Sequence, residues 1–263
     1  MRSFVNAGLN LAYDVVGDGF PVVLHTGAGG DSRMWRDAGY VAGLAGFQVV
    51  LLDHRGHGQS DAPSDPHGHA VADYAGDVLA LADELTVDCF AFWGYSNGAR
   101  VGYELSATQP HRITALVAAG GVDGPDDDPN EWREAARAVR SGGIRAILGD
   151  EATPVWLIQQ LADETEAEVV ARELECFAGW TPWPLFSRIV APTLIIVGEH
   201  ESENCAAAAA AIPEGRSVVL SGLGHLGAFA NGELALRHVR PFLDRTTRSE
   251  ETARREPAHD LHR

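Results

Sequence analysis

The hydrophobic pattern of the chain changes near residue 20. Before that point, apolar and polar residues alternate at 4–6 and 9–16 around an Asn-Ala-Gly turn, which predicts a β-hairpin. After it, short continuous apolar runs recur between segments of helical character. Such runs are typical of strands in a parallel sheet that helices cover on both faces. The predicted strands are residues 22–25, 49–53, 90–94, 113–119, 193–198 and 217–220.

The segments between these runs have a helical period. The clearest one places an apolar residue every three or four positions along one face, which predicts a helix over 71–85. We also predict helices over 97–109 and 226–243, and a small-residue helix over the alanine run 206–211.

One interval breaks the alternation of strands and helices. Between the predicted strands 113–119 and 193–198 lie roughly 70 residues of helical and turn composition, whereas an ordinary crossover needs about a dozen. We therefore predict an inserted helical cap. The last 18 residues contain one large apolar residue among many charges, a composition typical of disorder. The predicted parts are an α/β core of 1–121 and 192–245, a cap of 122–191 and a disordered tail of 246–263.

Charge and composition narrow the possible functions. The chain has 20 Lys plus Arg and 37 Asp plus Glu, so its net charge is 20 − 37 = −17, and all 20 cations are arginine. Without lysine, Schiff-base and pyridoxal chemistry, Ser-Lys dyads and the phosphate-binding lysine of a P-loop are excluded. The negative charge disfavours nucleic acid and anionic membranes as partners. Small neutral or apolar molecules remain as substrates.

Cysteine usage and the N-terminus predict a cytoplasmic location. Cys89, Cys176 and Cys205 are far apart and form no C-x-x-C pair, which argues against a disulfide framework or a zinc site. The N-terminus lacks the apolar segment of a signal peptide, and no window approaches 18 consecutive apolar residues. We expect no membrane span, and the oligomeric state stays open.

The sharpest chemical motif is the segment 94–98, Gly-Tyr-Ser-Asn-Gly, which we call the elbow. It follows an apolar run and precedes a helical segment, which is the strand-turn-helix context of a G-x-S-x-G nucleophile. A sharp turn that exposes the hydroxyl of Ser96 leaves no room for side chains at Gly94 and Gly98. It also places the amide of Asn97 at a helix N-terminus, where an oxyanion can be held.

Further motifs extend this pattern into a family resemblance. The segment 25–35, HTGAGGDSRMW, and the segment 53–61, DHRGHGQSD, stand before the elbow in the order typical of the α/β-hydrolase superfamily. Over residues 3–244 the chain resembles the serine-nucleophile branch of that superfamily, in particular small esterases and enol-lactonases. The resemblance implies an eight-stranded, mostly parallel sheet flanked by helices, with a small helical cap after the sixth strand.

The resemblance also implies a base and an acid for Ser96, in the chain order Ser, acid, His. His225, after the last apolar run, stands where the family has its catalytic histidine. Glu201, three residues after the glycine that ends the seventh strand, stands at the position of the acid, where relatives usually carry aspartate. Asp123, just after the sixth strand, is the alternative acid.

Two counts are possible in the loop that would bind the oxyanion. Counting back from Trp35 makes Ala28 the residue whose backbone N–H joins that of Asn97, whereas counting forward from His25 makes Gly27 the donor. We favour Ala28.

Aromatic residues are the expected substrate contacts. Tyr95 adjoins the elbow serine, and four of the six tryptophans fall in the predicted cap, where they could wall an apolar chamber. Alternatively, they attach the cap to the sheet. These tryptophans are Trp132, Trp156, Trp180 and Trp183.

We expect no metal and no cofactor. His54, His57, His67 and His69 lie close together in sequence, but no carboxylate-rich ligand pattern accompanies them. The acidic segment 126–131 lacks the glycine and glutamate of a calcium loop.

The predicted function is that of a cofactor-independent serine hydrolase, which cleaves an ester or lactone of a small, largely apolar substrate through an acyl-enzyme. Hydrolysis of a carbon-carbon bond and perhydrolysis use a similar triad in this fold and remain alternatives. A non-catalytic homologue that binds a small ligand is a further alternative, because the acid and the oxyanion loop both depart from the family pattern.

Overall fold

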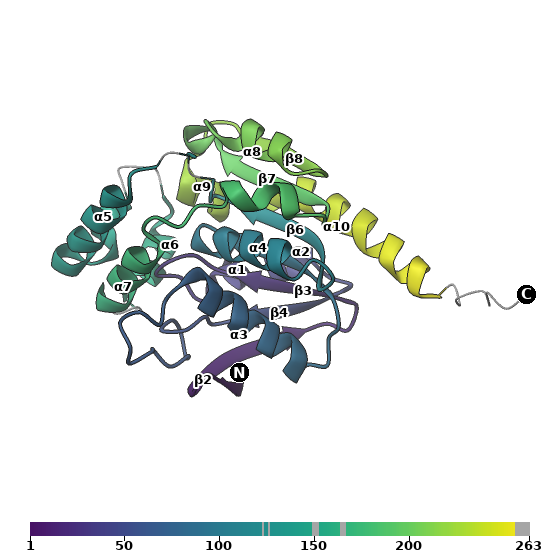
Figure 1. Cartoon of the computed structure of the whole chain (residues 1–263), viewed down its shortest axis with the longest axis horizontal. Coiled ribbons are helices and arrows are strands. Elements are labelled where there is room, and N and C mark those ends of the chain that lie inside the picture. The colour runs from purple at the N-terminus through teal and green to yellow at the C-terminus, as the bar shows by residue number, and fades with distance from the viewer. Residues whose placement is uncertain (123, 126, 149–152, 164–166, 256–263) are drawn as a thin grey trace, which may run out of the picture.

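Eight strands form one sheet in the structure, a computed structural model that describes residues 1–122, 124–125, 127–148, 153–163 and 167–255. Their order is β1-β2-β4-β3-β5-β6-β7-β8 (Figure 1). β2 pairs antiparallel with β1 and β4, and the other five pairings are parallel. The predicted eight-stranded, mostly parallel sheet is confirmed. The strands are β1 (Arg2–Asn6), β2 (Leu9–Val16), β3 (Phe20–His25), β4 (Phe47–Leu52), β5 (Phe90–Tyr95), β6 (Ile113–Ala119), β7 (Thr193–Gly198) and β8 (Gly215–Leu220).

The sheet separates two apolar layers because its side chains alternate between the faces. In β5, Trp93 and Tyr95 point into one layer and Phe90 and Phe92 into the other. Helices α1, α2, α9 and α10 contribute to the first layer, and α3, α4 and α8 to the second. Their bounds are α1 (Arg33–Asp37), α2 (Tyr40–Gly43), α3 (Val71–Glu84), α4 (Asn97–Thr108), α8 (Cys205–Ala211), α9 (His225–Ala230) and α10 (Gly232–Arg255).

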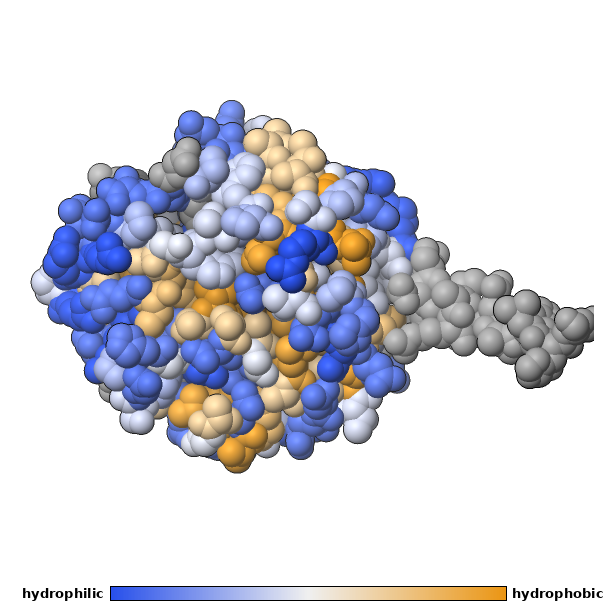
Figure 2. Space-filling model, viewed as in Figure 1, coloured by the Kyte–Doolittle hydropathy of each residue, from blue (hydrophilic) through white to orange (hydrophobic). Residues whose placement is uncertain are grey.

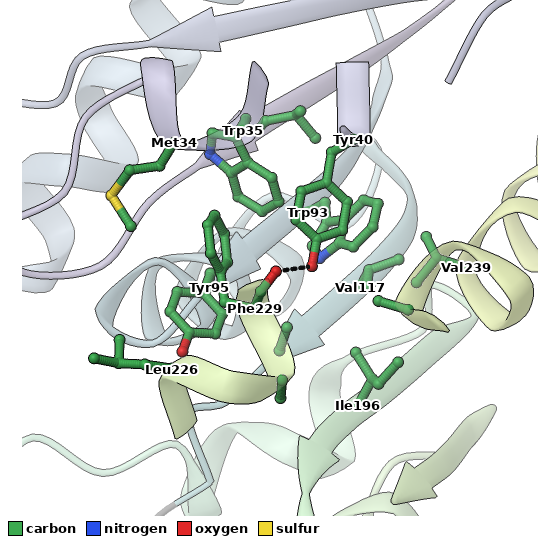
Figure 3. Close-up of a cluster of buried hydrophobic side chains, with 14 of the residues drawn as sticks. Met34, Trp35, Tyr40, Trp93, Tyr95, Val117, Ile196, Leu226, Phe229 and Val239 are labelled. Atoms are coloured by element: carbon green, nitrogen blue, oxygen red, sulfur yellow. Dashed lines mark hydrogen bonds between the residues drawn. The ribbon is translucent and has the colours of Figure 1, made fainter. Parts of the chain in front are cut away.

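An aromatic cluster in the first layer fixes α9 against the sheet (Figure 3). The rings of Trp35, Tyr40, Trp93 and Phe229 meet edge-on or tilted, with centroids 4.9 to 5.4 Å apart. Burial raises the pKa of Tyr40, so its hydroxyl stays protonated. This hydroxyl donates a hydrogen bond to the carbonyl of Phe229 at 2.7 Å. These contacts hold α9, which begins at His225, in place.

The described chain between β6 and β7 is helical. It contains α5 (Pro129–Gly142), the 3₁₀ turn η1 (Ile144–Ile147), α6 (Val155–Asp163), α7 (Ala167–Phe177) and η2 (Trp183–Arg188). Arg140 on α5 bonds Glu168 and Glu175 on α7, so these two helices form one unit. In Figure 1, α5, α6 and α7 lie together at the left of the molecule, and hydrophilic side chains cover much of that region in Figure 2. We call residues 122–191 the cap.

The C-terminal segment differs from the expected one in two ways. The predicted helix 226–243 is divided at Asn231, and Gly232 lies so close to the Ala38 carbonyl that a Cβ there would stand 2.0 Å from the oxygen. Helix α10 then continues through Arg255, past the predicted start of the tail at 246. A helix rich in Arg, Glu and Thr needs no apolar residues on its solvent-facing side, so composition alone did not separate it from disorder.

Of the helices in the described part of the chain, none combines the length and apolar character that crossing a membrane requires.

Candidate active site

The elbow is a strained turn between β5 and α4. Ser96 has φ 57° and ψ −121°, a conformation that costs a non-glycine residue about 1–3 kcal/mol. The glycines of the motif are required by close approach of the backbone. A Cβ at Gly94 would lie 2.0 Å from the carbonyl oxygen of Gly98, and a Cβ at Gly98 would lie 2.4 Å from that of His25. The turn lifts the hydroxyl of Ser96 into a cavity.

A chain of hydrogen bonds joins Ser96, His225 and Glu201. Nε2 of His225 lies 3.1 Å from Oγ of Ser96, and Nδ1 lies 2.6 Å from Oε2 of Glu201. Glu201 ends the 3₁₀ turn η3 (Glu199–Glu201) after β7, and its other oxygen accepts the N–H of Gly198 at 3.2 Å. The alternative acid, Asp123, lies outside the described residues.

The surroundings of Glu201 favour its charged form. Burial raises the pKa of this carboxyl, but the hydrogen bond with His225, the electrostatic attraction to that residue and the N–H of Gly198 outweigh burial and lower the pKa overall. A carboxylate can only accept hydrogen bonds, so the proton of the 2.6 Å contact belongs to Nδ1 of His225. Nε2 is then free to accept the proton of Ser96.

Two further residues lie against His225. The hydroxyl of Tyr95 donates to the backbone carbonyl of His225 at 2.7 Å, and the two rings lie 4.9 Å apart. Gly120, with φ 59°, leaves room for the imidazole, because a Cβ there would lie 3.0 Å from Cε1 of His225. Sequence reasoning missed Gly120; the glycine pair that follows the predicted strand 113–119 was the available signal.

The loop after β3 approaches the serine closely. A Cβ at Gly27 would lie 2.5 Å from Cβ of Ser96, so only glycine fits here. Gly27, Ala28 and Asn97 all line the cavity that contains Ser96. The turn after β4 stabilises this loop, since the N–H of Gly29 donates to Nε2 of His57 at 2.9 Å.

The cavity above Ser96 has a volume of about 510 Å³, and the cap supplies much of its wall. Of the four predicted cap tryptophans, Trp132 lines it. Trp156 packs against the first apolar layer, Trp180 lines a separate cavity of about 150 Å³, and Trp183 packs on Phe186 with ring centroids 5.2 Å apart. Tyr95 also lines the main cavity. The apolar side chains that the cap contributes are Val122, Trp132, Ile144, Ile147, Leu148, Leu161 and Leu174.

A second polar cluster lies buried behind the elbow. His54 and His57, from the turn after β4, meet Glu173 of α7, and ligand atoms of the three lie within 4.8 Å of one another. These are the described residues that could hold a metal, although Nε2 of His57 already accepts the N–H of Gly29. We did not anticipate the cluster because its carboxylate lies more than 100 positions along the chain from the histidines.

Buried histidines predict that acid unfolds the protein. Burial lowers the pKa of His25 and His69 to about 4, that of His57 to about 3 and that of His54 well below its ordinary value. Below about pH 6.5, the ordinary pKa of histidine, these four side chains bind protons in the unfolded chain but stay neutral in the folded protein. Each one therefore lowers the free energy of unfolding by about 1.4 kcal/mol for every unit that the pH falls. Glu173 has the opposite effect, because burial raises its pKa to about 7 and the folded protein binds this proton before the unfolded chain does. Near pH 5, we therefore expect the free energy of unfolding to fall by about 4 kcal/mol for each unit by which the pH is lowered.

Urea unfolding followed by circular dichroism between pH 7 and 4.5 measures this loss. Replacing the exposed His67 with glutamine is the control and should leave the pH dependence unchanged. A midpoint that stays constant over this range would contradict the prediction.

The strand order, the strained serine after β5 and the histidine after β8 together define the α/β-hydrolase class of enzyme. The sequence model of the family described as alpha/beta hydrolase fold matches residues 21–155. The chain therefore belongs to the α/β-hydrolase fold family, and we assign it to the hydrolases.

The chain is also similar to individual proteins and to a solved structure. The chain is 32% identical over 168 residues to "Putative carbamate hydrolase RutD" of Variovorax paradoxus, covering 63% of this chain and 62% of the relative. It is 26% identical over 256 residues to "Putative non-heme bromoperoxidase BpoC" of Mycobacterium tuberculosis, covering 86% and 94%. The crystal structure of the enol-lactonase from Burkholderia xenovorans LB400 superposes with a TM-score of 0.80 at 26% identity, covering 92% of this chain and all of that one.

Proposed function

We propose that the protein is a cofactor-independent serine hydrolase that cleaves a carboxylic ester or lactone through an acyl-enzyme. The observation that carries the proposal is the unbroken hydrogen-bond chain from Ser96 through His225 to Glu201, with the serine in a cavity of about 510 Å³.

The proposed mechanism follows from the direction of these bonds. His225 takes the proton of Ser96 as the serine oxygen attacks the substrate carbonyl carbon, and Glu201 stabilises the imidazolium. The backbone N–H groups of Asn97 and Ala28, or Gly27 in place of Ala28, hold the tetrahedral oxyanion. As the ester bond breaks, the imidazolium protonates the leaving oxygen. Water, activated by the same histidine, then attacks the acyl-enzyme and releases Ser96.

The proposed substrate is small and largely apolar. The cavity has the size of a small-molecule site, and the cap lines it mainly with aliphatic and aromatic side chains. The similarity to the enol-lactonase supports a lactone among the substrates. In a lactone the leaving oxygen stays attached to the acyl group, so this cavity must hold the opened ring until water attacks.

Covalent labelling tests the proposed nucleophile directly. A fluorophosphonate should phosphonylate the folded protein once, on the peptide that contains Ser96, and hydrolysis of p-nitrophenyl acetate should fall in proportion to the labelled fraction. Mass spectrometry of the digested protein locates the adduct. An absence of any adduct would instead indicate a homologue that binds a ligand without cleaving it, and a panel of esters, lactones and vinylogous diketones then defines the bond that is broken.

A further inference from the structure

The carboxyl group of Glu173 connects the cap to the catalytic turn. Glu173 lies on α7 and is 1% exposed. Its Oε1 accepts a hydrogen bond from the side-chain amide of Asn97 at 2.8 Å, and Asn97 directly follows the nucleophile. Its Oε2 points toward Nε2 of His57 at 3.4 Å and Nε2 of His54 at 3.9 Å.

The tautomers of both histidines follow from their other partners. Nδ1 of His57 lies 3.1 Å from the carbonyl oxygen of Arg55 and so carries a proton, while Nε2 accepts the N–H of Gly29. The hydroxyl of Thr26 donates to the carbonyl of Gly30. Its oxygen therefore accepts from Nδ1 of His54 at 3.3 Å.

Both histidines consequently present an unprotonated Nε2 to Glu173. Among the described residues, neither Nε2 of His54 nor Oε2 of Glu173 makes a hydrogen bond. If Glu173 were ionised, its Oε2 would lie in a buried site beside the acceptor atoms of two histidines, and the N–H of Gly29 is already bonded to one of them. Such an arrangement is unfavourable unless one more proton is present.

We propose that Glu173 is a neutral carboxylic acid in the working enzyme, with its proton on Oε2 facing the two histidines. In this state it is a positioning residue. Its carbonyl oxygen holds Asn97 and thereby the start of α4, and its hydroxyl faces the turn that supports Gly29 in the oxyanion loop. One side chain of the cap thus lies against the elements that carry both halves of the proposed oxyanion site.

The charged and titratable groups around Glu173 agree with this state. Burial raises the pKa of Glu173 to about 7, although the hydrogen bond from Asn97 and the charge of Arg100 on α4 lower it in part. Burial also keeps His54 and His57 neutral. On α3, burial raises the pKa of Tyr74, so the phenol keeps its proton. Among the described residues, Arg100 is thus a cation whose charge acts on this carboxyl, and its guanidinium stacks on Trp132 at 4.2 Å from the ring centroid.

A metal ion would satisfy the same three acceptors, but the hydrogen bonds argue against one. The lone pair of His57 that would bind a metal already accepts the N–H of Gly29 at 2.9 Å. The rings of His54 and His57 also lie only 3.8 Å apart and within 33° of parallel, so their lone pairs do not converge on one point.

The proposal predicts an infrared signature and a pH effect. The wild-type protein at pH 6 should show the carbonyl stretch of a buried carboxylic acid, which Glu173→Gln should lack. Glutamine also offers one acceptor and one donor, but it cannot ionise. Because the proposal assigns the working state to the protonated form, the rate of Glu173→Gln relative to wild type should rise by up to about tenfold per pH unit above pH 7. In this ratio of rates, the pH dependence of ionisable groups that both proteins share cancels.

The matched control is Glu175→Gln, two residues along the same helix, where the exposed carboxylate pairs with Arg140. This variant should retain the infrared band and the wild-type pH profile. The infrared band does not depend on the proposed function, so it tests the protonation of Glu173 even if no substrate is found. If the variant does not fold, the loss of the band from the wild-type protein as the pH is raised tests the same protonation. Absence of the band, a stoichiometric bound metal or parallel pH profiles would overturn the proposal.

Discussion

Replacing Ser96 with alanine should lower the rate of ester hydrolysis by at least about 10³-fold and leave the fold unchanged. The variant removes the oxygen that attacks the carbonyl, whereas the cavity and the backbone donors stay in place. A residual rate above that of water is expected from those donors. The serine hydroxyl makes its described side-chain contact with Nε2 of His225, so its loss costs little packing.

The measurement is kcat/KM for p-nitrophenyl acetate, with circular dichroism and denaturant unfolding as checks on the fold. Ser141→Ala, at an exposed serine on α5, is the matched control and should keep the wild-type rate. If Ser96→Ala kept a tenth or more of the wild-type kcat/KM, Ser96 would not be the nucleophile.

Glu201→Gln should lower kcat by about 10⁴-fold, more than Glu201→Ala does. The reason is the N–H of Gly198, which needs an acceptor and therefore keeps the amide oxygen of the glutamine on its side. The NH₂ group then faces His225 and donates to Nδ1, so the imidazole proton moves to Nε2. In that tautomer His225 cannot accept the proton of Ser96. Alanine removes the support of the carboxylate but imposes no tautomer.

Steady-state kinetics of the two variants at one pH separate these effects, and the ¹⁵N chemical shifts of the imidazole identify the tautomer directly. Glu203→Gln changes an exposed glutamate two residues later and should be silent. Equal rates for Glu201→Gln and wild type would remove Glu201 from the mechanism and direct attention to Asp123.

The sequence predicts most of the sheet because each buried strand is a local run of apolar residues. β5 and β6 read as continuous apolar segments, and α3 shows its buried face at a helical spacing; neither needs knowledge of the partner element. The elbow is predictable because its motif lies within five consecutive residues. Gly94 is required by the carbonyl of Gly98 in the same turn, whereas Gly98 is required by the distant carbonyl of His25.

Features that depend on cap packing were not predictable from the sequence. Nothing in the local sequence of Glu173 distinguishes it from Glu168 or Glu175 on the same helix, yet it is buried against Asn97 while they pair with Arg140 at the surface. The cap tryptophans show the same limit. Composition could not separate Trp132, which lines the main cavity, from Trp156 and Trp183, which pack elsewhere.

At position 96, the residue that would be best for stability differs from the residue that the proposed activity needs, because the backbone there is strained. With φ at 57°, glycine would suit this turn better than any residue that carries a Cβ, and serine is tolerated there at an energetic cost. Directed evolution that screens only for heat resistance would therefore favour glycine at 96 and lose the proposed nucleophile. Any such programme on this enzyme should screen for turnover in every round.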